Sequence, residues 1–173
     1  MNGKIIGIVI MLSALIGGVA LYYLQVYGFY EEVTGEDVQL ISVVSDLPET
    51  IPFADFEAID ADSSPIRYRA CFTTNMSLAL LTETYVGLET AAPRNAPGWF
   101  DCFDAKAIGA ELAAGTALPF LSLKNVEFGV DRIVAITEDG RGYAWHELND
   151  CGEKSYDGTI VGEECPDRTL TDQ

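Results

Sequence analysis

The sequence has little positive charge and almost no histidine. It holds 10 Lys and Arg against 27 Asp and Glu, a single histidine, and a net charge of −17 over 173 residues. Every acidic residue lies at or after Glu31, and only Lys4 of the basic residues precedes it, so residues 31–173 carry nine basic and 27 acidic side chains, a net charge of −18. Such a surface repels phosphate backbones and anionic lipid headgroups. We therefore expect no binding to nucleic acid.

The sequence also lacks the short motifs of common catalytic and metal sites. It contains no GxxxxGK[ST] phosphate loop, no GxSxG nucleophile turn, no HExxH zinc motif and no CxxC pair. A lone histidine beside Glu147, as His146 is, more often has a structural role than a catalytic one, because catalysis needs an orienting partner. We predict no cofactor, no metal ligand and no catalytic residue.

A long uncharged segment stands at the N-terminus. Ile5–Leu24 is twenty residues without a charge, which as a helix spans roughly 30 Å, the thickness of the bilayer hydrocarbon. Gly18-Val19-Ala20 fits the small-x-small pattern of a cleaved export signal, but cleavage there would cut inside the apolar run. We favour an uncleaved membrane anchor over residues 1–30. Aromatic residues typical of the headgroup boundary end it: Tyr22, Tyr23, Tyr27, Phe29 and Tyr30.

Charge around this segment predicts its orientation. Lys4 and the amino terminus favour the cytoplasmic side, and the other flank is acidic. In a Gram-negative bacterium the chain would then be a single-pass protein of the inner membrane with a periplasmic domain over residues 31–173. Small residues four apart would let a second membrane helix pack closely, which makes another membrane helix, besides the lipid bilayer, an expected partner. These residues are Ser13 with Gly17 and Ala14 with Gly18.

The four cysteines indicate an oxidising compartment. An even number of cysteines in an exported domain favours disulfides. Three pairings are open, and we favour Cys71 with Cys102 and Cys151 with Cys165. The second pair would close an irregular tail that has little apolar content of its own.

Residue patterns in the domain predict strands. Residues 66–74 alternate between two faces, residues 38–44 do so more loosely, and residues 118–123 read as a buried strand. Two strand-like runs flank Asp139-Gly140, a dipeptide suited to a hairpin turn. Residues 47–52 are rich in turn formers and read as a linker.

Two segments of the domain predict helices. Residues 75–85 read as a short helix capped by Asn75, and residues 105–114 as a helix capped by Asp104 and followed by Gly115. The predicted fold is α+β, an N-terminal transmembrane helix followed by a small domain with an antiparallel sheet and one or two helices.

Two arginines are unusual in so acidic a domain. Arg67 and Arg69 lie on one face of the predicted strand 66–74. We interpret them as ion-pair partners inside the domain, with contact to an anion as the alternative. If the domain is instead an enzyme or ligand-binding module, its pocket would use Arg67, Arg69, Trp99, Trp145 or His146.

Three segments of the domain also resemble a known family. The stretches "IDADSSPIRYRACFTT", "APGWFDCFDAKAIG" and "DRIVAITEDGRGYAWHELNDCGE" are similar to recurrent blocks of an uncharacterised family of small single-pass bacterial membrane proteins with a domain of unknown function. Members are sometimes labelled histidine kinases, a label that this sequence does not support because it lacks ATP-binding glycine boxes. The resemblance implies a location and a domain extent, and no activity or cofactor.

Together these observations predict a non-enzymatic envelope protein. An anchored acidic domain without a recognisable site is typical of a docking or assembly subunit of a membrane protein complex. The alternative is the periplasmic enzyme or ligand-binding module described above.

Overall fold

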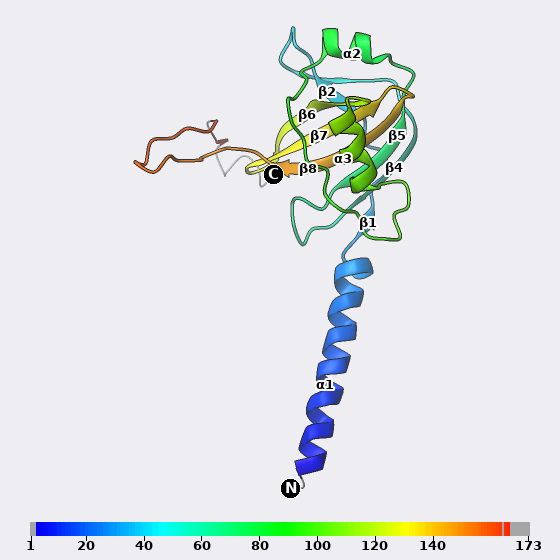
Figure 1. Ribbon diagram of the computed structural model, residues 1–173, viewed down its shortest axis with the longest axis vertical. Coiled ribbons are helices and arrows are strands. Elements are labelled where there is room, and N and C mark those ends of the chain that lie inside the picture. The colour runs from blue at the N-terminus through cyan, green and yellow to red at the C-terminus, as the bar shows by residue number, and fades with distance from the viewer. Residues whose placement is uncertain (1–2, 164, 167–173) are drawn as a thin grey trace.

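The computed structural model describes residues 3–163 and 165–166. An N-terminal helix projects from the rest of the molecule (Figure 1). It consists of the α-helix α1 (Gly3–Tyr23) and a π-helical turn, η1 (Leu24–Gly28). No residue of either element is buried. The helix is long and apolar enough to cross a membrane, and the same features suit an export signal.

The domain is built on one six-stranded sheet in which every neighbouring pair is antiparallel. The α+β fold predicted from the sequence is confirmed. In sheet order the strands are β1 (Glu31–Glu32), β4 (Ala54–Asp60), β5 (Arg69–Thr73), β8 (Arg141–Leu148), β7 (Val130–Thr137) and β6 (Ala117–Glu127).

Both faces of this sheet are covered, so alternate residues of its central strands enter two different cores. On β8, Ala144 packs in one core and Trp145 in the other. A small hairpin of β2 (Gln39–Ile41) and β3 (Pro48–Thr50), together with helix α2 (Leu78–Thr84), contributes to the first core. Helix α3 (Ala105–Ala114) and the loop before it contribute to the second. The central strands are therefore buried almost throughout.

The hairpin predicted around Asp139-Gly140 is confirmed. Strand β7 ends at Thr137 and β8 begins at Arg141, which leaves a three-residue loop, and the pair nearest the loop is Ile136 with Gly142. Gly140 closes it with a φ of 85°, and a Cβ there would lie 2.3 Å from the carbonyl oxygen of Thr74. The helix predicted at 105–114 is also confirmed, since the Asp104 side chain accepts from the main chain of Lys106 and Ala107.

The helix predicted at 75–85 starts later than expected. The chain remains attached to the sheet as far as Thr74, whose N–H donates to the carbonyl of Gly140. Helix α2 therefore begins only at Leu78, and Ser77 caps it by accepting from the main-chain N–H of Leu80. The prediction of Asn75 as the cap is wrong.

Residues 47–52 are not a linker. Pro48–Thr50 forms strand β3 against β2, and the main-chain N–H of Ile51 donates to the carbonyl of Val38. Leu40 and Ile51 are fully buried in the first core. Burial of these apolar side chains favours the paired strand despite the turn-forming residues around it.

Two disulfides join the cysteine pairs that the sequence favoured. Cys71 on β5 bonds to Cys102 in the loop before α3, and Cys151 bonds to Cys165. The second bridge closes a projecting segment, residues 150–163 with Cys165, which we call the arm (Figure 1). Ser155 and Thr159 hold the arm's outer turn through a main-chain hydrogen bond of 2.8 Å.

Candidate functional site

The side chain of Arg69 joins the turn before β5 to the loop at residues 94–98. Arg69 is 4% exposed and its guanidinium donates to four main-chain carbonyls. These are Arg94 (2.8 Å, from Nε), Ile66 (2.9 Å) and Tyr68 (2.6 Å, both from Nη1), and Asn95 (3.0 Å, from Nη2). Burial lowers the pKa of Arg69 to about 10, so the group stays charged at neutral pH.

Two side chains of the domain, Arg67 and Trp99, attach the N-terminal helix to it. The last carbonyls of a helix have no partner within it. Here Arg67 Nη1 donates to the carbonyl of Gln25 (3.2 Å), and Trp99 Nε1 donates to the carbonyl of Val26 (2.6 Å). The domain thus caps the end of the N-terminal helix with two of its own side chains.

Aromatic packing strengthens this junction. The Trp99 ring stacks on Tyr27 with centroids 6.3 Å apart and meets Tyr30 edge-on at 5.8 Å. The Arg67 guanidinium lies 5.5 Å from the centre of the Tyr30 ring, within cation–π range. The N-terminal helix and the domain therefore meet through aromatic rings, a cation–π contact and two side-chain hydrogen bonds as well as through the covalent chain.

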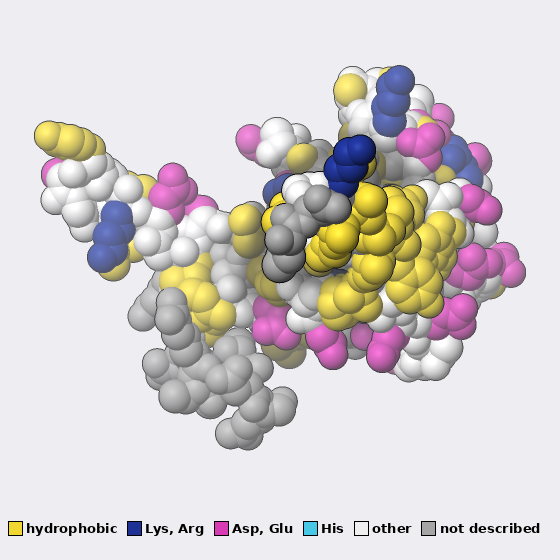
Figure 2. Space-filling view, turned by 90° about the horizontal axis from the view of Figure 1, so that it is seen from below, with side chains coloured by type: hydrophobic (Ala, Val, Ile, Leu, Met, Phe, Trp, Pro, Cys, Tyr) yellow, Lys and Arg dark blue, Asp and Glu magenta, His cyan; other side chains and the backbone are white. Residues whose placement is uncertain are grey.

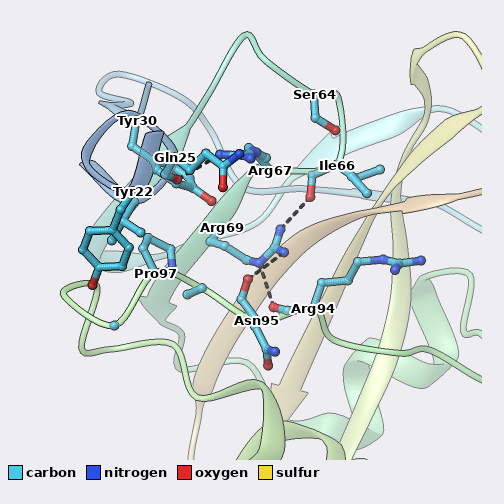
Figure 3. A pocket seen from close by; sticks show the side chains of 13 residues that line it. Tyr22, Gln25, Tyr30, Ser64, Ile66, Arg67, Arg69, Arg94, Asn95 and Pro97 are labelled. Atoms are coloured by element: carbon cyan, nitrogen blue, oxygen red, sulfur yellow. Dashed lines mark hydrogen bonds between the residues drawn. The ribbon is translucent and has the colours of Figure 1, made fainter. Parts of the chain in front are cut away.

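A cavity of about 610 Å³ lies at this junction (Figure 3). Its walls come from the end of the N-terminal helix, the turn before β5, and the loop at 94–98. In Figure 3, Arg69 lies between the two loops, Arg67 is directed to Gln25, and the exposed Arg94 side chain extends to the other side. Three of the residues that line the cavity are arginines, and none is an aspartate or glutamate.

These positions correct two expectations about the arginines. Strand β5 begins at Arg69, so Arg67 precedes it and the two do not share a strand face. Neither guanidinium forms an ion pair with any residue that the structure describes; both donate to main-chain carbonyls instead. The loop carbonyls already supply acceptors to Arg69, so no buried carboxylate is required.

The single histidine belongs to a separate buried cluster on the other side of the turn before β5. His146 Nδ1 lies 2.7 Å from the carbonyl of Pro65, and its Nε2 lies 3.1 Å from Arg132 Nε. Tyr68 stacks on the imidazole at 4.7 Å. Glu36 Oε2 accepts from both the Tyr68 hydroxyl (3.0 Å) and Arg132 Nη1 (2.9 Å).

This geometry fixes the protonation state of His146. The Pro65 carbonyl only accepts and the Arg132 Nε only donates, so the neutral ring carries its proton on Nδ1. Burial, followed by the nearby charge of Arg132, lowers the pKa of His146 to about 4. Both ring nitrogens of His146 have partners within the fold, so this arrangement of the histidine is structural.

Acid should therefore weaken the fold through His146. The folded pKa of about 4 lies below the unfolded value of about 6.5, so the contribution is complete above pH 6.5 and is lost as pH falls towards 4. We expect a loss of about 3 kcal/mol in the free energy of unfolding across this window. Urea unfolding of the full chain in mild detergent at several pH values measures it.

The matched control for this prediction is His146→Gln, which keeps an acceptor for Arg132 but does not titrate. Subtracting its pH profile from that of the unmodified chain removes the contributions of the carboxyl groups. A difference that stays constant between pH 6.5 and pH 4 would contradict the assignment.

The five residues of the alternative ligand site lie in three places. Arg67 and Arg69 line the junction cavity, and Trp99 packs beside it. Trp145 is fully buried in the second core, and His146 lies in the cluster with Arg132. Among the described residues, no group of three or more His, Cys, Asp or Glu side chains is placed to hold a metal ion.

Sequence reasoning missed the partners that complete both places. The helix carbonyls of Gln25 and Val26 accept at the junction, and Arg94 lines the cavity. Glu36 and Arg132, 96 residues apart, meet around Tyr68. Only the Pro- and Gly-rich composition of residues 93–98 marks that loop in the sequence, and composition does not reveal that it faces the N-terminal helix.

These features define a small, disulfide-bonded α+β domain carried by an apolar N-terminal helix. The chain belongs to DUF6446, a family of unknown function, whose sequence model matches residues 38–166. This agrees with the resemblance to an uncharacterised family. Comparison with curated proteins and with solved structures found no match.

Proposed function

We propose that the chain is a single-pass protein of the bacterial inner membrane, with its N-terminus in the cytoplasm and its domain in the periplasm, and that it acts as a docking or assembly subunit of an envelope complex. The observation that carries this proposal is the arm. Its side chains Tyr156, Ile160 and Val161 are exposed, while Cys151–Cys165 ties the arm's two ends together.

An exposed tyrosine on a constrained turn suits protein binding. Aromatic side chains supply much of the energy at interfaces, and a segment that is already ordered loses less entropy on binding. Acidic residues surround the apolar ones: Asp150, Glu153, Asp157 and Glu163. The partner surface that fits is an apolar pocket with Lys and Arg at its rim.

The membrane location is supported by the N-terminal helix and by the two disulfides. The helix has the length and hydropathy of a membrane span, and disulfides persist in oxidising compartments such as the periplasm. No residue of α1 is buried, and because Gly17 and Gly18 have no side chains, a second helix can approach the backbone closely there.

The function is tested by photo-crosslinking from the arm in intact cells. A photoreactive phenylalanine analogue at position 156 keeps an aromatic ring there, and the same analogue at Val44, 91% exposed on the β2–β3 hairpin, is the control. We expect one membrane protein to be crosslinked from position 156 and not from position 44. Equal products from both positions would argue against docking through the arm.

The crosslinked protein then permits a quantitative measurement. Tyr156→Ala should weaken its binding to the purified full chain roughly thirtyfold, which corresponds to about 2 kcal/mol, as expected for a central interface residue. Val44→Ala should leave the affinity unchanged. Replacing Gly17 and Gly18 together by leucine should weaken the same complex without preventing membrane insertion, since leucine blocks close helix approach.

The alternative, an enzyme or ligand-binding module, has one observation in its favour. Arg67 and Arg69 both line the junction cavity. Catalysis by His146 has less support, because both of its ring nitrogens already have partners. Turnover of a small molecule by the isolated full chain, abolished in His146→Gln, would favour the enzyme instead.

A further inference from the structure

The basic side chains of this acidic domain are unevenly distributed. Of the nine basic residues after Glu31, three line the junction cavity, and no carboxylate lines it. Figure 2, which views the molecule along the N-terminal helix, shows acidic side chains at the outer rim of this face. The cavity is therefore a positively charged recess next to an acidic rim.

The cavity also has a definite position relative to the predicted bilayer. Tyr22, on the last turn of α1, and Gln25 and Val26 of η1 form one of its walls. Tyrosine rings prefer the level of the lipid headgroups. A lipid beside the N-terminal helix would thus have its phosphate at the height of the arginines.

From these observations we infer that the junction cavity binds the phosphate group of an anionic lipid headgroup, held by Arg67 over the buried charge of Arg69. Arg67 is half-buried, whereas the Arg94 side chain is exposed and extends away from Arg67 (Figure 3). Guanidinium groups bind phosphate oxygens through paired, charge-assisted hydrogen bonds. The volume of about 610 Å³ falls in the range of small-ligand sites and has room for the phosphate with its glycerol.

The apolar part of the wall fits the rest of such a ligand. Val26, Ile66 and Pro97 line the cavity together with the arginines, so the first carbons of the acyl chains would contact apolar side chains. Arg69 contributes only long-range charge, because its guanidinium N–H groups already donate to the loop carbonyls.

This inference reverses a conclusion drawn from total charge. A net charge of −18 predicts repulsion of anionic headgroups at long range. Screening limits that repulsion to about 8 Å at physiological salt, so the nearest side chains decide what binds in a recess. The inference rests on membrane insertion of the N-terminal helix, but not on the proposed docking function.

Native mass spectrometry of the full chain tests the site. The protein is released from mixed micelles of phosphatidylglycerol, phosphatidylethanolamine and phosphatidylcholine in equal amounts, and the retained lipid is counted. We expect about one phosphatidylglycerol per chain. Replacing Arg67 by glutamine should lower its retention severalfold, because the charge-assisted contacts of its guanidinium are lost.

The matched control removes the same charge elsewhere. Lys106 and Lys154 are both exposed and lie outside the cavity, so changing either one to glutamine should leave retention unaltered. Because Arg67 also caps the N-terminal helix, the variant Arg67→Lys is measured as well; it keeps the positive charge and should retain most of the lipid.

A second measurement distinguishes the sources of phosphate. Inorganic phosphate is added to the lipid-free chain in detergent, and ³¹P line broadening reports its binding. Broadening that disappears in Arg67→Gln, without any preference for phosphatidylglycerol, would support a phosphate site for a soluble ligand and overturn the lipid assignment. Equal retention of all three lipids and no broadening would overturn the site itself, whatever the crosslinks from position 156 show.

Discussion

Removing the Cys71–Cys102 bridge, by changing both cysteines to alanine, should lower the free energy of unfolding of the full chain by about 3–4 kcal/mol. The bridge joins residues 31 apart in sequence, and closing a loop of that length restricts the unfolded chain by about this amount. The loss is a large part of the stability of an ordinary domain. Urea titration in mild detergent, followed by the fluorescence of buried Trp145, measures it.

The position of this bridge gives the prediction a second consequence. Cys102 lies three residues after Trp99, whose indole caps the N-terminal helix, and eight after Arg94. Without the bridge, the loop that carries both is held only by noncovalent contacts, among them those of Arg69, Trp99 and the buried Phe100. We expect the variant to become sensitive to limited proteolysis between residues 86 and 101 before the domain unfolds.

The second bridge supplies the control. Cys151 and Cys165 close the arm, which contributes no residue to either core. Changing both to alanine should release the arm and lower the stability of the domain by less than about 1 kcal/mol, since little of the arm's order is coupled to the sheet. Equal losses for the two pairs would contradict this account.

Replacing Gly142 by alanine should destabilise the domain by about 3 kcal/mol. Gly142 on β8 pairs with Phe72 on β5, and the Phe72 ring lies directly over it. An added Cβ would lie 2.1–2.6 Å from three atoms of that ring. Phe72 is buried in the first core, so the ring must leave a good rotamer or the strands must separate. Thermal unfolding of the full chain in detergent measures the loss.

Two further variants show whether the clash is the cause. Gly142→Ala combined with Phe72→Leu should recover part of the loss, because leucine places fewer atoms over the strand. Gly109→Ala on helix α3 is the matched control: its Cβ would meet only Pro93 at 3.7 Å, and alanine favours a helix by up to about 1 kcal/mol over glycine. A loss of stability in the control similar to that of Gly142→Ala would disprove the argument.

Local patterns in the sequence predicted the elements that are stabilised by contacts between residues close together in the chain. The hairpin at Asp139-Gly140 and the helix between Asp104 and Gly115 form where expected, because a turn glycine and a side-chain cap act on the neighbouring main chain. The apolar N-terminal helix follows from its composition for the same reason.

Elements that depend on distant contacts could not be predicted in this way. Pro48–Thr50 read as a linker, yet it forms a strand because Leu40 and Ile51 are buried beside it. The start of α2 is set by the bond between Thr74 and Gly140, 66 residues apart in sequence. Neither contact leaves a mark in the local sequence.

The candidate site illustrates the same division. The sequence itself determined that residues 31–173 are strongly acidic, that four cysteines suit two bridges, and that Arg67 and Arg69 are rare cations. Only the tertiary structure decided that these arginines face helix and loop carbonyls, that Arg94 joins them in one cavity, and that His146 lies apart from it. Charge and periodicity are properties of the chain, whereas the acceptors of a guanidinium are fixed by which loops the fold brings within about 3 Å of it.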